Sequence, residues 1–206
     1  MGKVVEFRGV DNLVYAEVTN DDNELSGGYT TGEVKSLAAV AEISKTTEVS
    51  SATKYYDNLP AIVINSEGSD EVTVTCAIPD LATYAEITGK TIDTATGAMI
   101  DGERDPKYFA LGYRFKKTDG TYRYVWRLKG MFAIPDETSA TEDDGTDGNN
   151  MSLVYTGIST THSFTKGGKP AKAVVVDDTA ESKADISTFF ETVTDPDKLK
   201  AKGVGG

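Results

Sequence analysis

Residues 40–53, VAEISKTTEVSSAT, have the composition of a β-strand but not the pattern of a strand in an ordinary soluble domain. They are rich in β-branched residues, Thr and Ser, and they contain no Gly or Pro. Side chains alternate along a strand, so one face carries Ala41, Ile43, Lys45, Thr47 and Val49, and the other carries Glu42, Ser44, Thr46, Glu48 and Ser50. Neither face is a continuous apolar stripe, and such a strand on its own should slip in register or aggregate. The stretch therefore predicts a ribbon that serves something other than the core of its own domain.

Length and charge limit the class of protein. The chain has 206 residues, enough for one large β domain or a domain with an arm. Its 21 Lys and Arg face 33 Asp and Glu, and the net charge of −12 argues against general affinity for nucleic acid or anionic lipid. A single Cys76 and a single His162 exclude an intramolecular disulfide and the usual zinc ligand sets. The first ten residues lack a signal-peptide core and no apolar run is long enough to span a membrane, so we expect a protein made in a cytoplasm and soluble there.

Hydrophobic periodicity predicts a mainly β chain with one or two helices. Period-2 or apolar segments predict strands over residues 13–18, 40–53, 61–64, 69–78, 131–134, 153–159 and 172–178. Residues 78–89, IPDLATYAEITG, change to a helical period, with Pro79 in the first turn, a stripe of Leu81, Tyr84, Ala85 and Ile87, and Gly89 as the stop. Residues 182–196, SKADISTFFETVTDP, also predict a helix, capped at Ser182 and ended by Pro196.

The sequence YRFKKTDGTYRYVWRL, residues 113–128, predicts a hairpin with a two-residue turn at Asp119-Gly120. Folding about that turn pairs Phe115 with Tyr124 and Tyr113 with Trp126. The opposite face then gathers the basic residues Arg114, Lys116, Arg123 and Arg127. Like charges placed opposite each other are unfavourable, so we expect something acidic to cover them. Phosphate is one candidate, and in a chain with a net charge of −12 an acidic protein surface is the favoured one.

Residues 135–150, PDETSATEDDGTDGNN, hold six acids and no base. The acids are Asp136, Glu137, Glu142, Asp143, Asp144 and Asp147. The simplest pairing sets these carboxylates on one subunit against the basic hairpin face of a neighbour.

Two stretches imitate ligand-binding loops. Residues 88–91, TGKT, resemble the end of a phosphate-binding loop, but Tyr84 occupies the position of that loop's first Gly. Residues 143–148, DDGTDG, resemble a calcium loop, but Gly145 replaces a ligand and Val154 stands where the closing Glu belongs. A helix cap and a solvated loop explain these stretches better.

The remaining reactive side chains also favour structural roles. His162 lies near Ser159 and Ser163, but no G-x-S-x-G elbow accompanies it. Cys76 lies on the apolar side of its strand and is expected to be a core thiol. We therefore expect no enzyme, no catalytic residue, no cofactor and no metal.

Three stretches together carry a family resemblance: residues 12–64, which include the turn sequence YYDN, residues 70–89, and residues 108–137. Their arrangement resembles the major tail proteins of long-tailed, non-contractile bacteriophages, particularly the type that infects Gram-positive hosts. The resemblance covers roughly residues 10–195 and is a whole-chain pattern, not a catalytic signature.

The resemblance implies a β-sandwich flanked by a helix, with long β arms or hairpins that complete an oligomeric barrel. It implies one domain over residues 1–198, with arm segments in 35–65 and 130–160, and a loose tail over 199–206. Six subunits would form a ring, and stacked rings would form the tail tube of a virion assembled in the host cytoplasm. If each subunit gives four strands, the ring has twenty-four strands about 4.8 Å apart and a circumference of about 115 Å. The corresponding barrel diameter is about 37 Å, which is wide enough for a DNA duplex.

The same resemblance implies a tape measure protein, a tail terminator and a distal tail or baseplate protein as partners. Genomic DNA would pass through without specific binding, and no membrane is involved. On this interpretation Glu42, Ser44, Thr46, Glu48 and Ser50 line the channel, while Ala41, Ile43 and Val49 pack onto the domain.

Other classes compete with this interpretation. The inner tube of a contractile phage tail or injection machine would share the fold and add a sheath. A secreted adhesin-type β module would be monomeric and would need a signal peptide. An enzyme is the most distant alternative.

Overall fold

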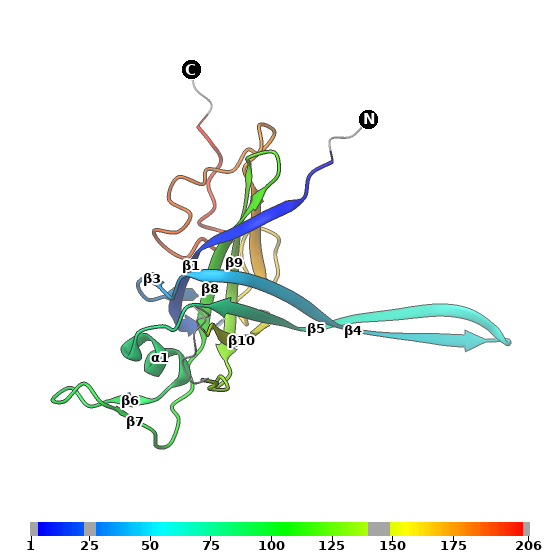
Figure 1. Ribbon diagram of the computed structural model, residues 1–206. Coiled ribbons are helices and arrows are strands. Elements are labelled where there is room, and N and C mark those ends of the chain that lie inside the picture. The colour runs from blue at the N-terminus through cyan, green and yellow to red at the C-terminus, as the bar shows by residue number, and fades with distance from the viewer. Residues whose placement is uncertain (1–3, 23–27, 140–148, 204–206) are drawn as a thin grey trace, which may run out of the picture.

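The computed structural model describes residues 4–22, 28–139 and 149–203, and this part of the chain is mainly β, as the sequence predicts. Figure 1 shows a body of strands from which one long hairpin projects. The strands are β1 (Phe7–Asp21), β2 (Tyr29–Thr31), β3 (Lys35–Ser36), β4 (Val40–Tyr56), β5 (Leu59–Cys76), β6 (Thr91–Ile92), β7 (Met99–Ile100), β8 (Phe109–Lys117), β9 (Tyr122–Phe132), β10 (Met151–Ile158) and β11 (Ala173–Asp177). The one helix of the described residues is α1 (Leu81–Thr88).

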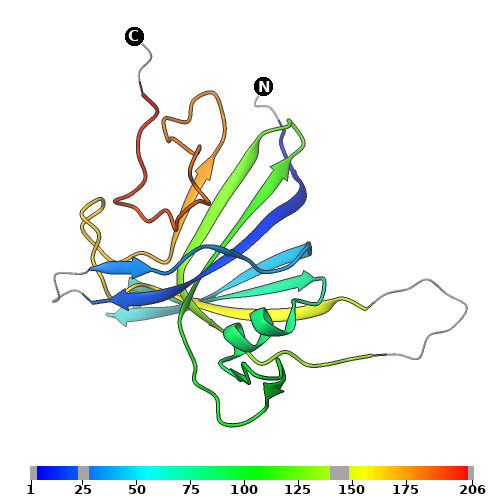
Figure 2. The same cartoon turned by 90° about the vertical axis from the view of Figure 1, so that its left-hand side faces the viewer.

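Nine strands form one antiparallel sheet in the order β2-β1-β8-β9-β10-β5-β4, with β3 added on β1 and β11 on β9. The sheet divides at β9. Residues 123–127 of β9 pair with β11, whereas residues 129–132 pair with β10. The strands consequently fan out in different directions from β9, as Figure 2 shows. This division lets different parts of the chain cover the two faces of the sheet.

The first hydrophobic core is enclosed by β1, β5, β8, β9 and β10. Tyr15, Val74, Phe109 and Leu153 are among its buried side chains, and Ile87 of α1 packs against them. Val72, Val74 and Cys76 are all fully buried, which confirms the half-buried strand expected over residues 69–78. The strict alternation of that segment is therefore the signature of one face set into this core.

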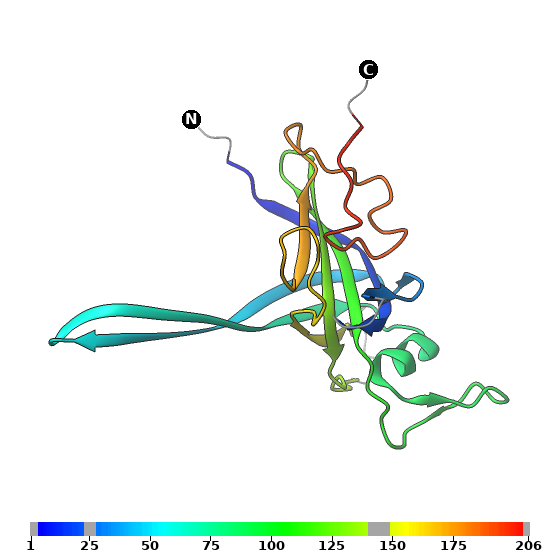
Figure 3. The same cartoon turned by 180° about the vertical axis from the view of Figure 1, so that it is seen from behind.

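The second core lies on the other face, under β11 and the C-terminal segment (Figure 3). Trp126 is its largest buried side chain, and Phe164, Val176 and Phe189 pack around it. Gly112 on β8 makes room for the indole, since a Cβ there would lie 2.8 Å from Trp126. The two cores together hold β9 between packed faces.

Helix α1 confirms the helix predicted within residues 78–89, but Pro79 precedes the N-cap and does not lie in the first turn. Asp80 is the N-cap, and its carboxylate accepts the backbone N–H of Thr83 at 2.9 Å. Gly89 ends the helix with φ +71°, the left-handed conformation that favours glycine. Tyr84 and Ile87 face the body, but Leu81 is 48% exposed, so the expected apolar stripe is incomplete at its start.

The hairpin of β8 and β9 differs in register from the prediction. Its loop has three residues, 118–120, because Gly120 adopts φ +87° and its N–H bonds the Lys117 carbonyl at 3.1 Å. Asp119 stabilises this turn by accepting the backbone N–H of Thr121 at 3.0 Å. The extra residue shifts every cross-strand pair by one. Phe115 is therefore opposite Arg123, and Tyr113 opposite Val125, so the predicted aromatic ladder is wrong.

The predicted helix over residues 182–196 is also wrong: the segment is a succession of turns. One tertiary and one local hydrogen bond compete with the helix, because the Phe189 carbonyl accepts from the Trp126 indole at 2.7 Å and from the Thr194 hydroxyl at 3.0 Å. A helix would need that carbonyl for its own backbone ladder. The tail expected to be loose is hydrogen-bonded as far as Lys202, whose N–H bonds the Lys183 carbonyl at 2.7 Å.

Candidate functional site: the β4–β5 arm

The most conspicuous feature of the fold is the hairpin of β4 and β5, which we call the arm. Its strands pair from Val40 and Cys76 at the body to Tyr56 and Leu59 at the tip. Asp57 and Asn58 form the turn with φ +50° and +64°, the two positive values of a tight hairpin turn. Figure 1 shows the arm leaving the body along its own direction. Residues 48–67, which we call the outer arm, are exposed without exception.

The outer arm exposes large apolar side chains on both faces. Paired residues share a face and faces alternate along each strand, so Tyr56, Ile62 and Ile64 lie on one face and Val49, Val63 and Tyr55 on the other, by the observed register. Ile62, the least exposed of the six, is still 49% exposed. Contiguous apolar surface of this kind marks an interaction site.

Strand β4 also has an unpaired edge. Among the described strands it pairs with β5 alone, so its other edge presents free backbone N–H and C=O groups along much of its 17 residues. A long exposed edge is a template for pairing with another chain. Natural proteins usually shorten, cover or charge such edges. Among the described residues nothing covers the edge of β4 in the outer arm, and the only charged side chains of β4 there are Glu48 and Lys54.

At its root the arm is fixed to the body by a buried carboxylate, Asp70 on β5. Arg127 of β9 donates to it at 2.5 Å and the Thr47 hydroxyl at 2.8 Å. The ammonium groups of Lys45 and Lys172 lie 3.8 Å away. Asp70 is only 3% exposed, and a buried charge is tolerated when it is paired and hydrogen-bonded. These four partners come from three parts of the chain and set the direction in which the arm leaves.

The residues predicted to line a channel lie together on the exposed side of the arm root. Glu42 pairs with Thr75, Ser44 with Thr73, and Thr46 with Glu71. We call the polar face the exposed or half-exposed set of Glu42, Ser44, Thr46, Glu48, Glu71, Thr73 and Thr75. Its β5 members follow from the same alternation in residues 69–78, although sequence reasoning had not assigned them. Ser50 lies further out, opposite Ser66.

The opposite side of β4 corrects part of the prediction. Ile43 packs against the first core as expected. Ala41 is exposed because it falls in the irregularity between the Val40 and Glu42 pairs. Val49 is 65% exposed because it lies beyond the edge of the body.

The basic residues of the β8–β9 hairpin do not form one ladder, because the shifted register separates them. Three of them already have acidic partners in their own chain: Arg114 binds Asp11, Arg123 binds Asp177, and Arg127 binds Asp70. The acids that cover these three arginines therefore come from their own chain, on β1, β11 and β5. Hydrogen bonds from Arg123 and Lys117 lower the pKa of Asp177 to about 2. Lys116 is exposed and has no ion-pair partner among the described residues.

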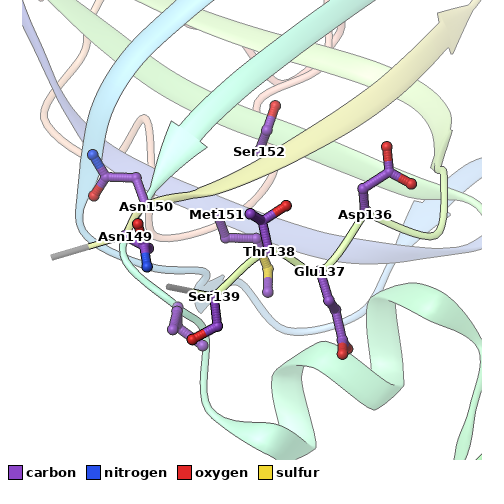
Figure 4. A pocket seen from close by; sticks show the side chains of 9 residues that line it. Asp136, Glu137, Thr138, Ser139, Asn149, Asn150, Met151 and Ser152 are labelled. Atoms are coloured by element: carbon purple, nitrogen blue, oxygen red, sulfur yellow. The ribbon is translucent and has the colours of Figure 1, made fainter. Parts of the chain in front are cut away.

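Two of the predicted acidic contact residues, Asp136 and Glu137, border a hollow of about 600 Å³. Ile78, residues 136–139 and residues 149–152 line it, and we call it the acidic hollow (Figure 4). Glu137 points toward α1, where it accepts a hydrogen bond from the Tyr84 hydroxyl at 3.4 Å. Burial and this carboxylate raise the pKa of Tyr84. Glu142 and the whole calcium-like stretch of residues 143–148, with Asp143, Asp144 and Asp147, lie outside the described residues.

The single Cys and His have the surroundings of packed side chains. Cys76 is fully buried in the first core, and burial raises the pKa of its thiol. The His162 ring packs edge-on against Phe164, and its backbone N–H bonds Asp21 at 2.9 Å. In the described ranges no group of three or more His, Cys, Asp or Glu side chains is placed to hold a metal ion. No helix in that part of the chain is long and apolar enough to cross a membrane.

Comparison with known proteins gives no family assignment. Neither a scan of protein-family models nor a search of curated proteins returns a match to this chain. Any function assigned to this chain therefore rests on three structural features: the arm, its buried root and its polar face.

Proposed function

We propose that this chain is the tube subunit of a long-tailed phage, with six copies joined into rings through their arms and the rings stacked into a tail tube. The observation that carries the proposal is the outer arm, whose two faces and one strand edge are all exposed. A monomer gains nothing from this ribbon and risks aggregation. Pairing between copies would turn the same features into a stable interface.

A closed ring of arms removes the exposed edges. Identical subunits that meet through two different surfaces form a ring when their rotation closes. If each arm pairs with the arm of the next copy, β4 gains a partner strand and the joined hairpins form one barrel. The apolar side chains of the outer arm then pack on neighbouring copies. The domain would thus fold alone, while the surfaces of its arm would be buried only between copies.

The polar face suits the wall of an aqueous channel. Its three carboxylates, Glu42, Glu48 and Glu71, lie among Ser and Thr hydroxyls, and it includes no Lys or Arg. A cation that contacts a DNA phosphate releases counter-ions and adds affinity. A hydrated wall without cations would let genomic DNA pass without holding it. The protein would be located in the virion, and its other partners would be those that the family resemblance implies.

The proposal is tested by comparing the full chain with a variant that lacks the outer part of the arm. Ser50 and Ser66 pair directly, so residues 51–65 can be replaced by an Asn-Gly turn that closes the shorter hairpin. Both cores and the Asp70 root lie outside the deletion. In sedimentation over a range of concentrations, the full chain should form rings or tubes and the short-arm variant should stay a folded monomer. Equal behaviour of the two proteins would refute the role of the arm.

A further inference from the structure

We infer that the acidic hollow of one copy receives the arm tip of a neighbouring copy. This inference rests on the proposed function and goes beyond it, because it names the surface on which the arm ends. Three observations carry it: the chemistry of the tip, the chemistry of the hollow, and the placement of the two on the body.

The tip has a basic residue and several apolar residues on the same face. Lys54 is paired with Ile62, and Tyr56 with Leu59, so these four side chains lie together by the alternation of the strands. Tyr56 and Leu59 are 61% and 67% exposed. No carboxylate among the described residues forms an ion pair with Lys54. The tip therefore offers one cation, Lys54, within an apolar patch, and the turn beside it carries one carboxylate, Asp57.

The acidic hollow offers the complementary surface. Ile78 and Met151 contribute its apolar lining, and Ile78 is 69% exposed. Asp136 and Glu137 are exposed at its border (Figure 4). About 600 Å³ is enough for a few large side chains, as in pockets that hold small ligands. The face of the tip that carries Lys54 is otherwise apolar, so it complements the apolar lining and the acidic border of the hollow.

The tip and the hollow belong to different copies when they meet. Helix α1, beside the hollow, lies on the side of the body that faces away from the arm tip, as Figures 1 and 3 agree. A paired hairpin that extends from a root fixed by Asp70 cannot fold back to that side. The contact is therefore between two different surfaces of two copies, the arrangement that closes rings.

Charge makes this contact selective. Each copy carries a net charge of −12, so two copies repel each other in general. An approach that brings Lys54 to Asp136 and Glu137 replaces part of that repulsion with attraction. The hollow would then both hold the arm and fix which side of the neighbour it reaches.

Cysteine cross-linking tests the contact directly. One variant carries Tyr56→Cys in the tip and another carries Ser152→Cys in the hollow, and the two are mixed before assembly and then oxidised. The native Cys76 does not compete, because it is fully buried. The matched control replaces Ser152→Cys with Gly102→Cys, an open position where a Cβ meets no atom within 4 Å.

The expected result is a disulfide-linked dimer from the tip and hollow variants, absent from either variant alone and from the control mixture. Peptide mapping should place the link between positions 56 and 152. Rings that form without this link, or a link from position 152 to another segment, would overturn the inference and leave the proposed function standing. A mixture that never assembles would overturn the proposed function itself, and the inference with it.

Discussion

Arg127 on β9 and Asp70 on β5 form a buried ion pair, 2.5 Å between Nη1 and Oδ2, at the point where the arm leaves the body. The two residues are 57 positions apart in sequence. Through this pair the arm is attached to the strand that separates the two cores. The direction of the arm is therefore a property of the whole sheet and not of the hairpin alone.

Removing the carboxylate at the root should destabilise the body. Asp70→Ala leaves the Arg127 guanidinium, only 12% exposed, without its partner, and we expect the free energy of unfolding to fall by about 3 kcal/mol. The matched control is Glu17→Ala, whose ion pair with Lys107 is accessible on both sides, with the two side chains 32% and 42% exposed. The control should cost less than about 1 kcal/mol. Urea denaturation measures both, and equal losses would contradict a structural role for Asp70.

Acid should weaken the contact between β9 and β11 at Asp177. Its pKa is lowered to about 2 in the folded chain, so its stabilising contribution is fully present above the ordinary value of 3.8. That contribution should disappear as the pH falls from about 4 to about 2. The stability difference between the natural chain and Asp177→Asn, measured by urea denaturation, should therefore be largest near neutral pH and shrink through this window. A difference that stays constant with pH would show that the ion pairs with Arg123 and Lys117 do not contribute.

Positive charge on the polar face should slow the passage of DNA through the tube. With Glu42→Lys and Glu48→Lys together, tubes should still assemble, because both side chains are exposed and the core is unchanged. DNA ejection from particles that carry the variant should be slower, and the delay should grow at low salt, where phosphate contacts are strongest. The neutral pair Glu42→Gln and Glu48→Gln is the matched control and should eject at nearly the natural rate. Unchanged ejection by the lysine variant would place this face outside the channel.

Reversing the charge on either side of the contact should weaken assembly, and reversing both charges together should restore it. Lys54→Glu in the tip should raise the concentration needed for assembly by about tenfold, since it places a carboxylate against Asp136 and Glu137. Asp136→Lys alone should have a similar effect, and the two together should recover most of the loss. Lys169→Glu, an exposed lysine in the loop before β11, makes the same change in net charge and should leave assembly nearly unaltered. Additive losses in the double variant would argue that the two residues do not meet.

The sequence predicts those parts of the fold whose signals are local. The alternation of residues 69–78 predicts a strand with one buried face, and the helical period that ends at Gly89 predicts the helix, whose N-cap Asp80 is found only in the structure. The mainly β architecture follows from the same periodicity. The length and polarity of residues 40–53 likewise indicated a strand without a core of its own.

One error is local, because the same Asp-Gly pair suits a turn of two residues and a loop of three, and the other errors arise where distant residues decide. The two-residue turn at Asp119-Gly120 became a three-residue loop, which moved each basic side chain to a new partner. The Trp126 indole takes a carbonyl that a helix over 182–196 would need. The acid partners of Arg114 and Arg127 lie on β1 and β5, far from the hairpin in sequence. No periodicity in the sequence encodes such pairs. For the same reason the sequence does not indicate that Asp70 is buried and paired with Arg127.

The central claim is that the arm functions by packing between copies, and electron microscopy of the purified chain tests it most directly. The account predicts rings of six copies, or stacked tubes, with an open centre. In a map that resolves side chains, Glu42 and Thr46 should face the opening and Ile43 should point into the body. Featureless monomers at every concentration, or a ring with Ile43 facing the opening, would contradict the account.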